Sequence, residues 1–151
     1  ESMARSQAFG KQLGERLLLV DWFAAAQAEV VLAAGRMEDA LSLAQVAVEL
    51  AQAVGSLYSE GLAQRVWGQA LAEASPPSWD EAEAHLAASL HLLESGEALL
   101  EAVRTQVVWG QACRKRGDME AAHEHFARAV VQLQDAGLAH ERARVLGYLA
   151  S

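Results

Sequence analysis

Histidine and cysteine are the side chains that most often hold metals or carry catalysis, and this 151-residue chain has five histidines and one cysteine. His123 and His125 are two residues apart in the segment AHEHF, so on a helix they project to nearly opposite sides and cannot chelate one metal ion. His85 and His125 fall at equivalent places in two copies of an internal repeat, which favours a role in the repeat itself. The sequence therefore predicts no metal site and no cofactor.

Signals for nucleophilic and phosphate-binding chemistry are equally weak. Cys113 lies where a repeat packs a large residue, so we expect a buried, unreactive thiol. The segments GKQLGE and GQACRKRG lack the glycine spacing and the preceding strand of a phosphate-binding loop. Because no nucleophile, base and orienting residue are grouped together, we expect no catalytic residues and no enzymatic activity.

Composition limits the possible partners and the compartment. A net charge of −8 and a pI near 5.0 disfavour direct nucleic-acid binding, because most of the surface repels phosphates. Every apolar run is interrupted before it reaches the roughly 18 residues of a membrane span, and residues 1–20 do not resemble a signal peptide. A lone cysteine excludes a disulfide framework. We expect a cytoplasmic protein that binds neither nucleic acid nor membrane directly.

Helices must position these side chains, since the chain is rich in Ala, Leu, Glu and Gln. Glycines recur 41 residues apart, each after an apolar periodic stretch, as helix-ending glycines do: Gly14, Gly55, Gly96 and Gly137. A second series of small residues recurs 40 to 42 residues apart: Ala28, Gly68, Gly110 and Ala150. The pattern predicts a repeated unit of two helices, in which small residues let the paired helices approach closely.

The two series set the boundaries of the predicted helices. First helices are expected at 17–34, 58–74 and 98–116, and second helices at 37–54, 79–95 and 119–136. The units span 15–55, 56–96 and 97–137, with the tail of a preceding helix at 1–14 and a partial fourth unit at 138–151. Ser78 followed by Glu81 predicts a capping box, and Asp118 predicts an N-cap.

The residues around the small positions resemble the tetratricopeptide repeat (TPR), whose signature is W-x2-L-G-x2-Y followed by A-x3-F and a proline. The clearest copies place Trp67-Gly68 and Trp109-Gly110 at the L-G step and end the second motif at Phe126. This resemblance covers nearly the whole chain and implies an all-α fold, an α-solenoid of helical hairpins in a right-handed superhelix. The longer period, without the proline, is similar to repeats of large bacterial regulators and polarity scaffolds. About three full repeats with partial repeats at both ends predict a piece of a longer protein.

In TPR proteins the first helices line a concave groove, and that placement implies a partner-binding site here. Its residues are Trp22, Glu29, Arg65, Gln69, Arg104, Gln111, Arg114, Lys115, Arg144 and Tyr148. Five of these are cations in an acidic protein, which favours an acidic or carboxylate-bearing peptide as the partner. The two aromatic residues are expected to be exposed, either as peptide anchors or as surface covered by neighbouring repeats.

Ordinary structural roles for these charges stay open. Arg104 and Arg144 could pair with Glu101 and Glu141, three residues earlier on the same helix. The cations at 114–116 also suit the C-terminal end of a helix, where the dipole favours positive charge.

The sequence thus predicts a non-catalytic protein–protein interaction module that binds a peptide in its groove. The alternative is a regulatory or sensor segment of a larger bacterial multidomain regulator, such as a transcription factor, a cyclase or a signalling ATPase. In either case the open ends of the solenoid could stack on further repeats or on another copy of the chain.

Overall fold

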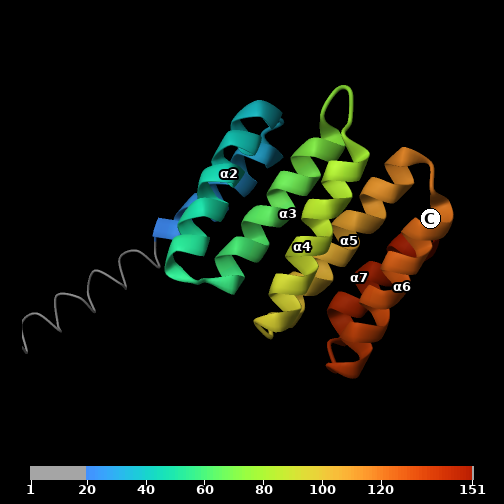
Figure 1. The fold of residues 1–151 in the computed structure, drawn as a ribbon. Coiled ribbons are helices and arrows are strands. Elements are labelled where there is room, and N and C mark those ends of the chain that lie inside the picture. Colours follow the sequence, from blue (N-terminus) through green and yellow to red (C-terminus); the bar gives the residue numbers. More distant parts are fainter. Residues whose placement is uncertain (1–19, 151) are drawn as a thin grey trace, which may run out of the picture.

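Helices and short turns make up the structure, a computed structural model that describes residues 20–150 (Figure 1). Within that range the first helix covers 20–33. The helices that follow are α2 (Met37–Val54), α3 (Leu57–Glu73), α4 (Trp79–Ser95), α5 (Leu99–Arg116), α6 (Met119–Asp135) and α7 (Ala139–Ala150). No strand occurs among residues 20–150, so this part of the protein is all-α, as predicted. The predicted tail of a preceding helix at 1–14 lies outside the described residues.

Each helix packs against the next one along the chain, and α3 also contacts α5 (Figure 1). Four buried clusters hold these contacts together. Two join helix 20–33, α2 and α3, one lies mainly between α3 and α4, and one joins α5, α6 and α7. The core is therefore distributed along the chain rather than gathered at one centre.

Small residues lie where paired helices come closest. A Cβ atom added to Gly68 would lie 2.8 Å from Cγ of Leu86, and one added to Gly110 would lie 2.5 Å from Cε1 of Phe126. Ala82 and Ala122, on the facing helices, are fully buried. The predicted role of the small residues in close helix packing is confirmed.

Gly14 lies outside the described residues, and the other three predicted glycines stand at helix ends, one of them in a different conformation from that expected. Gly55 and Gly137 adopt left-handed backbone conformations, with φ of 72° and 73°. Gly96 was expected to do the same, but its φ is −83°, and Glu97 takes the left-handed conformation with φ of 58°. The prediction for Gly96 was therefore wrong by one position. The turn after α6 has the same form, because the right-handed residue Ala136 precedes the left-handed Gly137.

The two predicted N-caps have different outcomes. Asp118 is confirmed, because its carboxylate accepts a hydrogen bond of 3.1 Å from the backbone N–H of Ala121. Ser78 occupies the N-cap position of α4, but its side chain makes no capping hydrogen bond, so the predicted capping box was wrong. The backbone N–H of Ser78 donates to the carbonyl of Leu71, at 3.0 Å, and ties the turn to α3.

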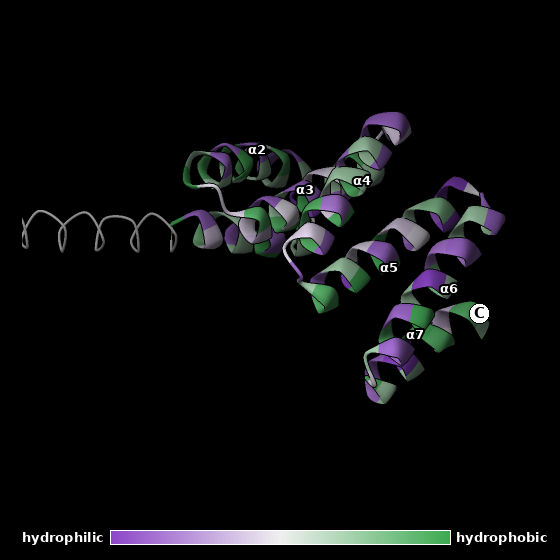
Figure 2. Ribbon diagram, turned by 60° about the horizontal axis from the view of Figure 1, so that its bottom comes forward, coloured by the Kyte–Doolittle hydropathy of each residue, from purple (hydrophilic) through white to green (hydrophobic). Residues whose placement is uncertain are grey.

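Hydrophobic and hydrophilic residues alternate around the helices (Figure 2). This pattern fits helices that bury one side and expose the other. None of the helices between residues 20 and 150 has the length and apolar character needed to cross a membrane.

Candidate functional site

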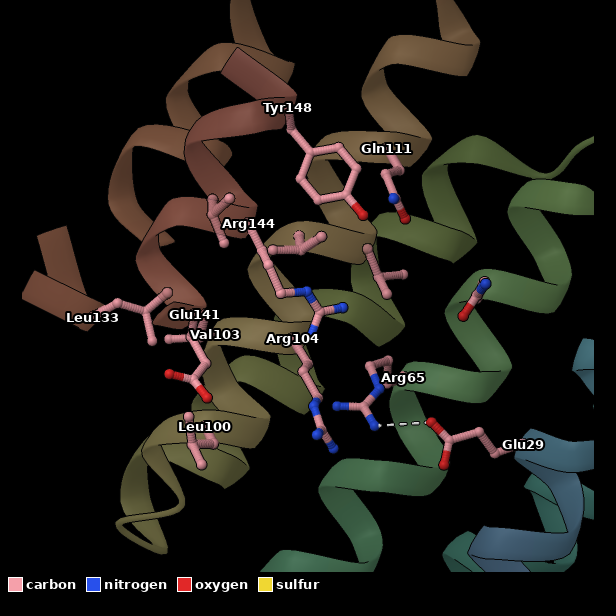
Figure 3. Close-up of a pocket in the computed structure, with 14 residues that line it drawn as sticks. Glu29, Arg65, Leu100, Val103, Arg104, Gln111, Leu133, Glu141, Arg144 and Tyr148 are labelled. Carbon is pink, nitrogen blue, oxygen red and sulfur yellow. Dashed lines mark hydrogen bonds and ion pairs between the residues drawn. The ribbon is translucent and has the colours of Figure 1, made fainter. Parts of the chain in front are cut away.

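The helices α3, α5 and α7 border a hollow of about 360 Å³, which we call the main hollow (Figure 3). Its apolar lining comes from α5, α6 and α7: Leu100, Val103, Val107, Val108, Leu133 and Val145. Its polar lining consists of Glu29, Arg65, Gln69, Arg104, Gln111, Glu141, Arg144 and Tyr148. The site therefore combines an aliphatic wall with both signs of charge.

A second hollow, of about 170 Å³, adjoins the first. It shares Gln69, Val108 and Gln111 with the main hollow and adds Glu73 and Lys115 among its lining residues. Because the two hollows share lining residues, they lie next to each other over α3 and α5. We call the two hollows together the groove.

The groove contains most of the predicted partner-binding residues. Seven line the main hollow: Glu29, Arg65, Gln69, Arg104, Gln111, Arg144 and Tyr148. Lys115 lines the second hollow. Trp22 and Arg114 line neither hollow, so their assignment to the groove is not supported by the geometry.

Arg114 connects two helices instead of facing the groove. Its Nη2 donates a 2.6 Å hydrogen bond to the backbone carbonyl of Tyr148, and its guanidinium lies 5.1 Å from the centre of the Phe126 ring. Tyr148 itself is half-buried, not exposed, because its ring stacks on Phe126 with centroids 5.4 Å apart. Trp22 is exposed as expected and makes an edge contact with Phe23.

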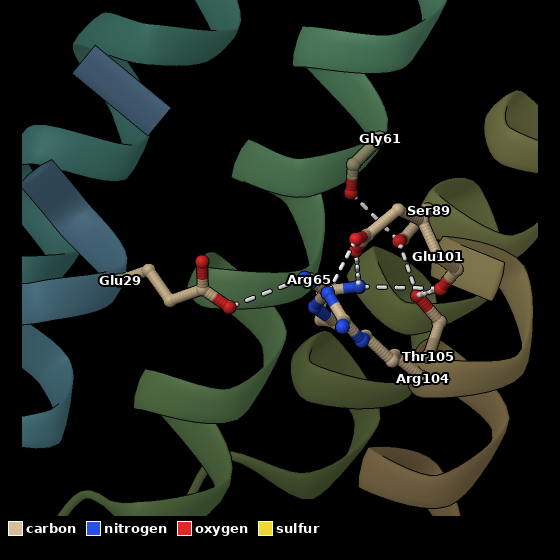
Figure 4. A network of polar contacts seen from close by, with 7 residues as sticks. All are labelled: Glu29, Gly61, Arg65, Ser89, Glu101, Arg104 and Thr105. Atoms are coloured by element: carbon tan, nitrogen blue, oxygen red, sulfur yellow. Dashed lines mark hydrogen bonds and ion pairs between the residues drawn. The ribbon is translucent and has the colours of Figure 1, made fainter. Parts of the chain in front are cut away.

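Arg65 lies at the edge of the main hollow, but its charge is already paired. Its side chain is only 4% exposed. Its Nη1 lies 2.8 Å from Oε2 of Glu101 and its Nη2 lies 3.2 Å from Oε1 of Glu29 (Figure 4). The expectation that Arg65 offers a free positive charge to a partner is therefore corrected, because two carboxylates from neighbouring helices neutralise it.

A buried polar network surrounds this ion pair and joins α3, α4 and α5 (Figure 4). The hydroxyl of Ser89 donates to the carbonyl of Gly61 at 2.7 Å and lies 2.9 Å from the hydroxyl of Thr105. The carbonyl of Glu101 accepts from both Thr105 and Arg65. Sequence reasoning missed this network. A signal was present, because Glu29, Arg65 and Glu101 alternate in charge and stand 36 residues apart. This spacing is about one helical turn shorter than the repeat of 40 to 42 residues.

Two of the predicted arginines are exposed beside the main hollow. Arg104 is 66% exposed and pairs with Glu101 at 2.6 Å, which confirms one of the predicted pairs within a helix. Arg144 is exposed, and its side chain makes no ion pair or hydrogen bond with another residue in the described range, so the suggested pair with Glu141 is not formed. Figure 3 shows that Arg65, Arg104 and Arg144, from three helices, extend toward the same part of the main hollow.

The equivalent histidines belong to helix packing. The ring of His85 stacks on Trp67 at 4.0 Å between centroids, and its Nδ1 lies 2.6 Å from Oε1 of Gln64. His125 repeats the arrangement with Trp109 and with Gln106 at 2.8 Å. Burial lowers the pKa of both imidazoles below their ordinary value.

The thiol of the single cysteine is also unsuited to act as a nucleophile. Cys113 is buried, as predicted, and burial raises the pKa of its thiol to about 11, which disfavours the nucleophilic thiolate. Within residues 20–150, no cluster of three or more His, Cys, Asp or Glu side chains could hold a metal ion.

Comparisons with protein-family models, with curated proteins and with solved structures find no match for this chain. The groove is therefore the feature from which a function can be inferred. Its aliphatic wall can bury apolar groups of a ligand, and its exposed guanidinium groups can donate paired hydrogen bonds to a carboxylate.

Proposed function

We propose that the protein is a non-catalytic interaction module that binds an acidic or carboxylate-bearing peptide segment in the groove. The proposal includes a TPR-like architecture, an α-solenoid with a right-handed superhelix whose first helices lie on the inner side. It is supported by the repeated small residues, by packing between consecutive helices and by the groove over α3, α5 and α7.

The observation that carries the proposal is a pair of exposed arginines beside an apolar hollow. Arg104 and Arg144 stand six residues before Gly110 and Ala150, so they occupy the same place in successive repeats. Both line the main hollow together with Val103 and other aliphatic residues. A carboxylate bound by these guanidinium groups would place a neighbouring aliphatic side chain against that wall.

The dimensions favour a short segment as the ligand. The 360 Å³ of the main hollow lies at the lower end of the range of ligand sites, which is roughly 300–1,000 Å³. This is room for one or two side chains, not for a folded domain. Because the arginines are exposed, salt should weaken the binding.

The test is a binding titration with a fluorescein-labelled peptide of alternating Glu and Leu residues, alongside a peptide of alternating Lys and Leu. We expect saturable, salt-sensitive binding of the acidic peptide, and at least about tenfold weaker binding by Arg144→Glu, which is about 1.4 kcal/mol. The matched control is Arg128→Glu, the same charge change on an exposed residue of α6 outside the groove. Equal affinity for the two peptides, or an equal loss of affinity in Arg144→Glu and Arg128→Glu, would contradict the proposal.

A second candidate is a regulatory segment of a larger multidomain protein. It is supported by the exposed apolar residues Phe23 and Val30 on helix 20–33, which suit contact with a further part of such a protein. The sequence of the complete gene tests this candidate, since a DNA-binding, cyclase or nucleotide-binding domain joined to the repeats would support it.

A further inference from the structure

Most of the charge around the main hollow is already compensated within the protein. Arg65 is held between Glu29 and Glu101, and Arg104 pairs with the other carboxylate oxygen of Glu101. Two cations and two carboxylates thus form one chain of alternating charge, whose net charge is zero. A ligand meets this network mainly through Arg104, its most exposed member.

Two further charged side chains line the main hollow, and both come from α7. Glu141 and Arg144 stand three residues apart, a spacing at which opposite charges can pair on a helix. Neither side chain forms an ion pair or a hydrogen bond with any residue in the range 20–150. Figure 3 shows the carboxylate of Glu141 beside Val103 and Leu100, whereas the guanidinium of Arg144 extends toward Arg104. The hollow therefore presents one uncompensated carboxylate and one uncompensated cation at separate places.

The helix dipole explains the charge of Glu141 but not its place in the hollow. Glu141 lies in the first turn of α7, where the dipole favours a carboxylate. Glu120 has the same place in α6, yet it is exposed and lines neither hollow. Glu141 is half-buried among aliphatic lining residues, so a cation that reaches it is less screened by water than one beside Glu120.

We propose that the segment bound in the groove carries a basic residue close to its acidic residue, and that Glu141 selects the basic one. This inference rests on the proposed function and adds a charge pattern to it. The acidic group binds Arg144 and Arg104, and the ammonium group of a lysine binds Glu141. The aliphatic stem of that lysine would lie on Val103 and Leu100.

The spacing of the two charges on the segment follows from α7. Three residues of a helix advance by about 4.5 Å, and the charged ends of Glu141 and Arg144 diverge from there (Figure 3). In an extended segment, side chains two positions apart point to the same side and are about 6.7 Å apart. An acidic and a basic residue two positions apart therefore match the hollow.

Three fluorescein-labelled peptides of equal length test this pattern. Each has one glutamate at its centre, in a sequence where leucine alternates with glutamine. The first peptide has no other charged side chain. The second has lysine two positions before and two positions after the glutamate, so the direction of binding need not be known. The third has the same two lysines at its ends, and it is therefore an isomer of the second with equal charge.

Anisotropy titrations compare the full chain with the variants Glu141→Lys and Glu120→Lys. Both variants reverse one carboxylate in the first turn of a helix, but only the first does so in the hollow. We expect the full chain and Glu120→Lys to bind the second peptide about two- to fivefold more tightly than the third. Glu141→Lys should lose or reverse this preference. It should still bind the first peptide at least as tightly as the full chain does, which shows that the variant is folded.

Equal affinity of the full chain for the two isomers, or a preference that Glu141→Lys retains, overturns the inference. In both cases, binding of the first peptide and its loss in Arg144→Glu would still support the proposed function, so the two ideas fail separately. If the full chain binds none of the three peptides, both are wrong. A dimer of the full chain that dissociates in Glu141→Lys, seen by sedimentation velocity, would make a second copy the occupant and would also overturn the inference.

Discussion

Replacing Arg65 with methionine tests whether this arginine is part of the fold rather than a contact for ligands. The substitution retains much of the apolar stem but removes the guanidinium. Three hydrogen bonds are then lost: 2.8 Å to Oε2 of Glu101, 3.2 Å to the carbonyl of Glu101 and 3.2 Å to Glu29. The side chain of Glu101, only 14% exposed, is left with Arg104 as its ion-pair partner.

The size of the effect follows from the burial of each partner. Breaking a buried ion pair from one side costs about 3–5 kcal/mol. The loss should be smaller here, because Glu101 keeps Arg104 and the side chain of Glu29 is 56% exposed to water. We therefore expect Arg65→Met to lose about 2–4 kcal/mol of unfolding free energy, or roughly 4–16 °C in melting temperature for a chain of this size.

Thermal and urea unfolding followed by circular dichroism measure this loss. The matched control is Arg104→Met, which removes the other cation paired with Glu101 but changes an exposed side chain, and it should cost no more than about 1 kcal/mol. A cycle with Glu101→Gln should show coupling between positions 65 and 101. If Arg65→Met and Arg104→Met lower the free energy of unfolding by the same amount, the network does not stabilise the fold, and Arg65 is again a candidate for contacting the ligand.

Three further predictions concern protonation and backbone packing. Because burial lowers the pKa of His85 and His125 in the folded state, the stability that their neutral rings contribute is complete above the unfolded value of 6.5 and is lost as the pH falls below it. Urea unfolding from about pH 7.5 to pH 5 should show this decline, and the variant H85Q/H125Q should show a smaller one. Gly110→Ala should lower the free energy of unfolding, measured in urea, by about 1–3 kcal/mol, because the added Cβ would lie 2.5 Å from Phe126. Gly147→Ala is the control: a Cβ there has nothing within 4 Å, so the change should stabilise the protein by up to about 1 kcal/mol. Equal effects of the two variants would contradict the packing described. Glu97→Gly should raise the melting temperature slightly, because a non-glycine residue in the left-handed conformation costs about 1 kcal/mol and glycine does not incur that cost. A lower melting temperature of this variant would contradict the assigned strain.

Helix boundaries could be predicted from the sequence because they depend on local chemistry. Gly55 and Asp118 end and begin their helices through their own backbone and side chain, so each signal is complete within a few residues. The turn after α4 could not be predicted to the residue. The regular spacing of the glycines indicates where α4 ends, but the left-handed conformation falls on Glu97 rather than on Gly96.

The groove could be predicted only in part, because helical periodicity gives the face of a residue but not its neighbours. Arg65 was placed on the correct face, yet its two carboxylate partners lie 36 residues away on other helices. Arg114 reaches the backbone of α7 because its side chain is long, and no spacing rule includes that reach. Arg144 lines the main hollow and forms no ion pair among the described residues, and its role in binding a partner stays a prediction.

The most direct test of the account is where on the protein an acidic segment binds. Two-dimensional NMR spectra of the isotope-labelled chain can be followed while the peptide of alternating Glu and Leu is added. The account predicts that the shifted amides cluster on α5 and α7 around Val107, Gln111 and Val145, which line the main hollow. Shifts confined to α2, α4 and α6, or none at the highest peptide concentration, would contradict it.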